Sequence, residues 1–325
     1  MKKNISINAS KHQQKVLAVA TVSMFLSACG GGGGSNGTVP TTPAVTPFTS
    51  WSAVANGSTV VVPSMSQEVT QTTDPIAGLV TGIGTPTAVD TAASYFIETL
   101  NSSGTITKVV ITSPTGSLTF DTAASDSIAH LLIDPTINAA LKSDQSSFAL
   151  AADPSALGNG WEYQSFGVWS TGRVTGSGSA GVMSVGAPTT GAAIPTSGTA
   201  TFIGKSIGFY TDATGVGYGV FSDLSVNADF AARTLGLSST GSVKTHDYVT
   251  PSPASNLNLT GSLIYAAGTN SFVFNNLTTS GGTLTGTSTG RFYGPGAQEL
   301  GGVFILKAGG GSIETYGGAY GAKRP

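Results

Sequence analysis

Apolar and polar residues alternate along much of the second half of the chain. Between residues 224 and 230 every second side chain is apolar and the others are polar: Leu224, Val226, Ala228 and Phe230 against Ser225, Asn227 and Asp229. A similar pattern runs through Leu257, Leu259, Leu263 and Tyr265. Because successive side chains of a strand point to opposite faces, this period predicts strands with one face in a core and one in water.

Roughly eight to ten such runs fill residues 158–325, and Gly, Pro, Ser and Thr separate them. Many short strands with frequent glycine are typical of a small closed barrel, which leaves no exposed sheet edge. A sandwich of two sheets is the alternative. No alternation of helices and strands appears that would indicate a nucleotide-binding α/β fold.

Residues 48–157 form a second candidate domain with a mixed pattern. Two β-patterned runs, 94–100 and 105–111, flank a turn sequence at 101–104 and predict a hairpin. Ile128, Leu131 and Leu132 then recur at helical spacing after possible capping residues at 125 and 126. Asp134 and Pro135 are expected to end this helix and to begin a second short one. We therefore expect a β-rich domain with one or two short helices.

The composition narrows the class of protein. Charged residues make up 9% of the chain, 45 of its 325 residues are glycine, and the formal net charge is −2. This balance argues against a helical enzyme and gives no basic surface for nucleic acid.

The N-terminus has the pattern of a bacterial lipoprotein signal. Four lysines precede a ten-residue apolar run, 16–25, which is short for a membrane-spanning helix and suits a secretory signal. Leu26, Ser27 and Ala28 then lead to Cys29, the only cysteine. We expect cleavage after residue 28 and lipidation of Cys29, with residues 29–47 as a Gly-, Pro- and Thr-rich linker.

The residue after the cysteine bears on location. In enteric bacteria an Asp there favours the inner membrane, whereas this chain has Gly30. We expect an outer-membrane lipoprotein, on the cell surface rather than the periplasmic face, although the linker itself fits both.

Several segments carry a family resemblance. They are residues 161–172, 194–204, 228–235, 290–302 and 317–324, in order along the chain. Together they resemble the transferrin-binding-protein-B-like family of bacterial surface lipoproteins, with 161–172 as the first barrel strand. The resemblance implies a mainly β fold: an eight-stranded antiparallel barrel (158–325) preceded by a smaller handle domain (48–157).

The resemblance also implies a function in binding rather than catalysis. Known members bind host transferrin, bind haem or haem proteins, or engage complement factor H, and the transferrin receptors have two handle–barrel lobes where this chain has one. We expect an extracellular ligand and a role in iron or haem uptake, with a TonB-dependent receptor or a surface-lipoprotein translocon as further partners. The alternatives are an adhesion or immune-evasion protein and a structural envelope lipoprotein.

The C-terminal segments hold the motif residues of the resemblance: Arg291, Gly294, Pro295, Glu299, Gly301, Gly302, Lys323 and Arg324. Gly294 and Pro295 predict a turn, and the glycine pair 301–302 predicts close strand approach or a bulge. Glu299 is expected to pair with Arg291, Lys323 or Arg324, and a solvated Glu299 is the alternative.

Little in the chain points to chemistry. Residues 286–290 match the Gly-x-Ser-x-Gly esterase pattern, but they lie in β-patterned sequence where a strand–turn–helix elbow is required. No metal-site spacing and no resident cofactor are expected. His130, predicted to be exposed on its helix, and His246, in a predicted loop, are the candidate ligands for haem iron.

Overall fold

The computed structural model describes residues 47–156 and 160–325, so the predicted signal peptide, the linker and Cys29 lie outside the described residues. Within these ranges the chain is almost entirely β, and the helical elements are three short 3₁₀ turns: η1 (Thr122–Ala124), η2 (Gly191–Ala193) and η3 (Ser255–Leu257). None of the helices described there has the length and apolarity needed to cross a membrane.

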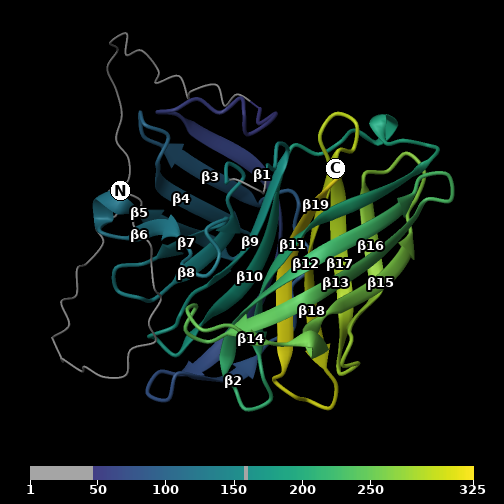
Figure 1. Ribbon diagram of the computed structural model, residues 1–325. Coiled ribbons are helices and arrows are strands. Elements are labelled where there is room, and N and C mark those ends of the chain that lie inside the picture. Colours follow the sequence, from purple (N-terminus) through teal and green to yellow (C-terminus); the bar gives the residue numbers. More distant parts are fainter. Residues whose placement is uncertain (1–46, 157–159) are drawn as a thin grey trace, which may run out of the picture.

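The strands form two sheets that lie side by side (Figure 1). The first sheet has the order β5-β4-β3-β1-β10-β9-β8-β7-β6, with β2 added to β1. Its strands are β1 (Thr59–Asp74), β2 (Leu79–Ile83), β3 (Tyr95–Leu100), β4 (Ile106–Ser113), β5 (Gly116–Asp121), β6 (Ser127–His130), β7 (Ile137–Leu141), β8 (Phe148–Ala152), β9 (Gln164–Ser170) and β10 (Ser177–Gly186).

The first sheet curls until its two edge strands approach each other. The carboxylate of Asp126, between β5 and β6, accepts hydrogen bonds from the backbone N–H groups of Asp121 (3.0 Å) and Ser143 (2.9 Å). The same carboxylate pairs with Lys142 at 2.8 Å, and Lys142 also donates to the Thr119 carbonyl in β5. These contacts nearly close the sheet into a second barrel-like body.

The second sheet is a closed antiparallel barrel of eight strands. They are β11 (Thr199–Thr211), β12 (Gly217–Asp229), β13 (Thr234–Thr245), β15 (Leu259–Ile264), β16 (Ser271–Thr279), β17 (Leu284–Tyr293), β18 (Glu299–Ala308) and β19 (Thr315–Lys323), and a two-residue strand, β14 (Ser252–Pro253), adds to β13. The ladder between β11 and β19 closes the ring. The predicted barrel is confirmed, and the sandwich alternative is wrong.

Side chains fill the barrel interior. In β12 the predicted alternation holds, with Leu224, Val226 and Ala228 buried. Near one end Phe292 contacts four aromatic rings at centroid distances of 5.4–6.2 Å: Phe202, Phe230, Tyr265 and Phe272. The barrel is therefore a packed core rather than a container.

The first sheet packs against the barrel wall. Phe166 and Val182, from β9 and β10, share one hydrophobic cluster with Ile207, Val303 and Ala319 of the barrel. All of Glu299–Leu306 in β18 and most of β19 are consequently buried on both faces. Doubly buried strands carry continuous apolar runs instead of alternation.

Two details of the sequence analysis are corrected. Residues 161–172, interpreted as the first barrel strand, include β9, which pairs with β8 and β10 in the first sheet. The boundary between the sheets therefore falls between Gly186 and Thr199, later than the expected 157/158. β9 is buried along its whole length, and its composition does not reveal which sheet it joins.

The predicted helices around residue 130 are also wrong. Residues 127–130 form β6, which pairs with β7. Asp134 caps no helix: its carboxylate accepts from the backbone N–H of Thr136 (2.9 Å) in a tight turn. Pairing with β7 overrides a weak local helical pattern.

Candidate functional site

Loops from both sheets meet at one end of the molecule, which we call the hairpin end: residues 74–78, 171–176, 212–216 and 246–250. Backbone hydrogen bonds connect the first three of these loops, from Thr73 N–H to the Gly176 carbonyl (2.9 Å) and from Val80 N–H to the Gly215 carbonyl (2.8 Å). β2 marks this end, and the C-terminus lies at the opposite one (Figure 1). Because the two sheets are hydrogen-bonded there, their loops form one continuous surface.

Each of three hairpin-end loops presents an exposed apolar side chain. Ile76 is 92% exposed, Val174 52% and Val249 37%. The Asp74 carboxylate accepts from the backbone N–H groups of Ile76 (2.8 Å) and Ala77, and the Asp247 carboxylate accepts from Val249 (2.9 Å) and Thr250. These turns fix the loop backbone and hold apolar side chains in water.

Aromatic and cationic side chains gather beside these loops. The ammonium group of Lys244 lies 4.3 Å from the ring centroid of Tyr218 and 5.6 Å from that of Tyr210. The two tyrosine rings stack with centroids 6.0 Å apart, and the Tyr210 hydroxyl donates to Glu314 (2.7 Å). Burial, followed by the nearby Asp212, raises the pKa of Tyr218 above its ordinary value. The cluster is a preformed, partly exposed aromatic surface.

The structure separates the two candidate histidines. His246 is exposed at the hairpin end, where its ring meets that of Tyr218 edge-on at 6.0 Å. Its Nδ1 lies 2.8 Å from the Gly217 carbonyl oxygen, and only a protonated Nδ1 can bond to a carbonyl. In the neutral ring Nε2 is then the free acceptor, the state in which histidine binds metals.

His130 lies elsewhere and is less accessible than predicted. Its side chain, on β6, is 21% exposed, and its Nδ1 is 3.6 Å from a carboxylate oxygen of Asp153. Residues 47–156 and 160–325 contain no group of three or more His, Asp or Glu that could hold a metal ion.

Glu299 does not make the predicted ion pair. It is 3% exposed, and the described residues place no cationic side chain within 4 Å of it. Its carboxylate accepts from the backbone N–H groups of Glu162 (2.7 Å) and Tyr163 (3.1 Å), in the segment leading into β9. Burial raises the pKa of Glu299 to about 7 although these hydrogen bonds lower it.

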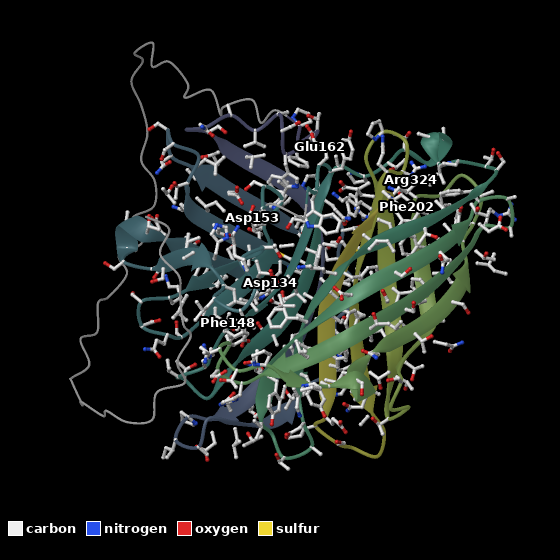
Figure 2. The ribbon with its side chains drawn as sticks, in the orientation of Figure 1. Asp134, Phe148, Asp153, Glu162, Phe202 and Arg324 are labelled. Atoms are coloured by element: carbon white, nitrogen blue, oxygen red, sulfur yellow. The ribbon has the colours of Figure 1, made fainter. Side chains whose placement is uncertain are left out.

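The three basic motif residues have other roles. The Lys323 ammonium donates to the Gly160 carbonyl (3.2 Å), and the Arg324 guanidinium donates to the Gly296 carbonyl and lies 5.9 Å from the Phe202 ring. Arg291 pairs with Gly301 in the β17–β18 ladder. In Figure 2, Arg324 and Glu162 lie at the end opposite the hairpin end.

The two motif glycines permit close approach at different places: Gly301 at the contact between the sheets, and Gly302 within the barrel. A Cβ on Gly301 would lie 2.2 Å from Oε1 of Gln164 and 2.9 Å from Oγ of Ser184, both in the first sheet. A Cβ on Gly302 would lie 2.5 Å from the Tyr320 hydroxyl. Both ladders of β18 run through these positions without a bulge, so the pair permits close approach.

The turn before β18 also belongs to this contact. Gly294 has a φ of +85°, and a Cβ there would lie 2.5 Å from the ring of Tyr163. Pro295 follows it in the tight turn between β17 and β18, and Thr189 donates to the Gly294 carbonyl (2.6 Å). We call the contacts of Gly294, Glu299 and Gly301 with the first sheet the joint.

Sequence reasoning missed the residues that connect distant segments. Gln164, fully buried, donates to the carbonyls of Leu300 (2.8 Å) and Ala322 (3.2 Å), and so connects β9 with two barrel strands. Tyr218 and Lys244 belong to no recognisable sequence motif, and they come together only through the pairing of β12 with β13. Ser288 of the esterase-like pattern lies within β17, buried, with its Oγ 3.0 Å from the Tyr320 hydroxyl.

The barrel matches a known family in sequence. Residues 194–324 match the family of C-lobe and N-lobe beta barrels of transferrin-binding protein B. No curated protein sequence matches this chain.

Solved structures provide further similar chains. A variant of transferrin-binding protein B from Actinobacillus pleuropneumoniae is 13% identical with a TM-score of 0.41, over 81% of this chain and 100% of that one. A variant from Haemophilus parasuis is also 13% identical, with a TM-score of 0.37 over 81% and 76% of the two chains. The haemoglobin receptor HpuA from Kingella denitrificans is 14% identical, with a TM-score of 0.35 over 88% and 92%.

Proposed function

Because residues 194–324 form a barrel of the transferrin-binding protein B type, we propose that this chain is an outer-membrane lipoprotein that binds an extracellular host protein for iron or haem acquisition. The observation that carries the proposal is the hairpin end. There, loops of both sheets present exposed apolar tips beside the Tyr218–Lys244 cluster. The chain acts by binding, and catalysis is not part of the proposal.

The chemistry of the hairpin end suits a protein ligand. Protein interfaces are rich in aromatic side chains, and a few well-packed anchors carry most of the binding energy. Ile76 and Val249 stand on turns fixed by aspartate carboxylates, so little loop entropy is lost when a partner covers them. Tyr218 adds a large apolar surface with a polar hydroxyl.

The ligand test follows from the similar proteins. Transferrin and haemoglobin are the first ligands to offer, by biolayer interferometry on the purified chain. We expect Ile76→Asp, Val174→Asp and Val249→Asp each to weaken capture about tenfold or more. Ile264→Asp is the matched control, since Ile264 is 75% exposed on the barrel wall. Equal loss in all four variants would remove the hairpin end as the binding surface.

The lipid anchor and the surface location have separate tests. Palmitate labelling should be lost in Cys29→Ser, and protease added to intact cells should remove the folded part. Protection from protease would place the chain on the periplasmic face. A TonB-dependent receptor and a surface-lipoprotein translocon are the partners we propose for uptake and display, and cross-linking on intact cells tests both.

Two measurements separate the remaining alternatives: the response of expression to iron starvation and the capture of a host protein. An adhesion or immune-evasion protein would capture a host protein while its expression ignored iron starvation. A structural envelope lipoprotein would capture nothing.

Haem is a second candidate ligand, favoured by the tautomer of His246. Its Nδ1 bonds to the Gly217 carbonyl, which leaves Nε2 able to ligate iron. Tyr218 and Lys244 beside it offer an aromatic face and a cation for a propionate. A haem titration should give a Soret shift that His246→Ala abolishes and His130→Ala preserves; equal spectra for both variants would end this candidate.

A further inference from the structure

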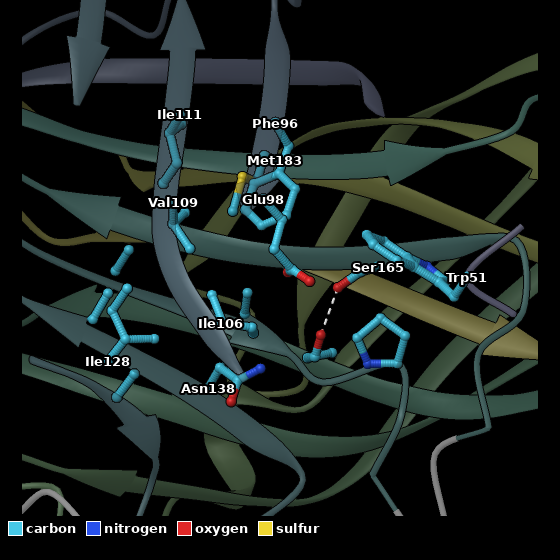
Figure 3. Close-up of a pocket in the computed structure, with 16 residues that line it drawn as sticks. Trp51, Phe96, Glu98, Ile106, Val109, Ile111, Ile128, Asn138, Ser165 and Met183 are labelled. Carbon is cyan, nitrogen blue, oxygen red and sulfur yellow. Dashed lines mark hydrogen bonds between the residues drawn. The ribbon is translucent and has the colours of Figure 1, made fainter. Parts of the chain in front are cut away.

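A small cavity lies inside the first sheet, away from the hairpin end. Its volume is about 30 Å³, and strands β3, β4, β6, β7, β8, β9 and β10 line it, largely with aliphatic side chains such as Ile106, Val109 and Ile128 (Figure 3). Trp51 and Pro154, both half-buried, lie at one side of it. A cavity of this size has room for about two water-sized groups.

One acidic side chain points into this cavity. Glu98, on β3, is 8% exposed, and Figure 3 shows its carboxylate directed into the lined space. Within the described part of the chain, no hydrogen bond or ion pair reaches this carboxylate. Keeping a largely buried carboxylate without a protein partner is costly, so a carboxylate of this kind aimed into a cavity points to a ligand.

In residues 47–156 and 160–325, the charged groups near Glu98 include another carboxylate, that of Asp153, and no free cation. Burial, and secondly the charge of buried Asp153, raises the pKa of Glu98 to about 7. His130 faces Asp153 rather than Glu98. The two lysines of the neighbouring strands are already committed, Lys108 to Asp121 and Lys142 to Asp126. Among the described residues, the chain therefore supplies no cation to this cavity.

We propose that the cavity binds a short alkylammonium ion of two or three heavy atoms. Its ammonium group pairs with the Glu98 carboxylate, and its alkyl part lies against Ile106, Val109 and Ile128. The site is independent of the proposed protein ligand, because it uses other residues in another part of the fold.

The test is calorimetric titration of the full chain in detergent with methylammonium and ethylammonium at pH 8. We expect binding, with ethanol and acetate, the neutral and anionic analogues, giving none. Butylammonium should bind at least tenfold more weakly because the cavity is short. Glu98→Gln should lose at least tenfold in affinity, while Asp144→Asn, an exposed carboxylate of the same sheet, should keep it.

A second measurement needs no variant. Because a protonated Glu98 cannot form the ion pair, the affinity of the unaltered chain should fall about tenfold between pH 8 and pH 6. No binding of either small ammonium ion, equal affinity in Glu98→Gln, or equal affinity at the two pH values would each overturn the proposal.

Discussion

The Glu299 carboxylate in barrel strand β18 lies 2.7 Å from the backbone nitrogen of Glu162, just ahead of β9 in the first sheet. The second carboxylate oxygen accepts from the next backbone N–H, that of Tyr163. A single buried side chain thereby satisfies two consecutive donors of the other sheet. This contact fixes the sheets at the end opposite the hairpin end.

Replacing Glu299 by Ala should weaken the joint. Alanine has no acceptor for the backbone N–H groups of Glu162 and Tyr163. A buried donor left without a partner costs roughly 1–3 kcal/mol of unfolding free energy. Urea unfolding at pH 5.5, where the Glu299 side chain of the unaltered chain is mostly protonated, measures this loss. Asp144→Asn, on the surface, should remain within about 0.5 kcal/mol of the unaltered chain.

Gly301→Ala should separate the sheets while leaving each formed. The new Cβ would lie 2.2 Å from Gln164 Oε1, and this side chain is held by hydrogen bonds to two carbonyls. Overpacking of this kind costs roughly 1–3 kcal/mol. Faster proteolysis between β10 and β11 would report the separation. Gly309→Ala is the matched control, since a Cβ there meets nothing within 4 Å.

Stability should fall as the pH rises toward neutrality. The folded-state pKa of Glu98 and of Glu299 is raised to about 7, so folding takes up protons between the ordinary carboxyl pKa and pH 7. The stabilising contribution is full below pH about 4.5 and is lost as the pH passes 7. For Glu98 the change is on the order of 3 kcal/mol, and Glu98→Gln should remove it.

Urea midpoints from pH 4.5 to 8 test this dependence. Asp144→Asn is the control. Hydrogen bonds to Ser146 lower the pKa of Asp144, so its titration affects stability only below the measured range of pH 4.5 to 8. An unchanged slope in Glu98→Gln would contradict the assignment of the slope to Glu98.

Asp126→Ala should open the near-closure of the first sheet. It removes the acceptor of two backbone N–H groups and leaves Lys142 without its partner. Removing one partner of a buried ion pair costs about 3–5 kcal/mol of unfolding free energy. Because Lys142 is only half-buried, we expect the loss for Asp126→Ala to be near the lower end of this range. Hydrogen exchange should accelerate in β5, β6 and β7 while the barrel amides keep their protection; uniform protection would contradict this role.

The barrel can be predicted from the sequence because one face of β12 is exposed to solvent. Leu224 and Val226 therefore alternate with polar residues, and this alternation is visible in the sequence. It does not place β9, whose residues are buried on both faces, or β6, whose short helical pattern yields to pairing with β7. Which strand pairs with which depends on residues far apart in the sequence, so local patterns do not predict it. The candidate site was missed for the same reason: Tyr218 and Lys244 come together only through the β12–β13 ladder, and Glu299 contacts Glu162 across 136 intervening residues.

The ladder between β11 and β19 has a kinetic consequence. It joins residues 203–211 to residues 315–323, so the ring closes only when the last strand becomes available. Contacts of such long sequence separation make folding slow. If such a chain crosses a membrane N-terminus first, its barrel segment therefore remains unfolded until almost all of it has crossed. It stays competent for translocation during that time.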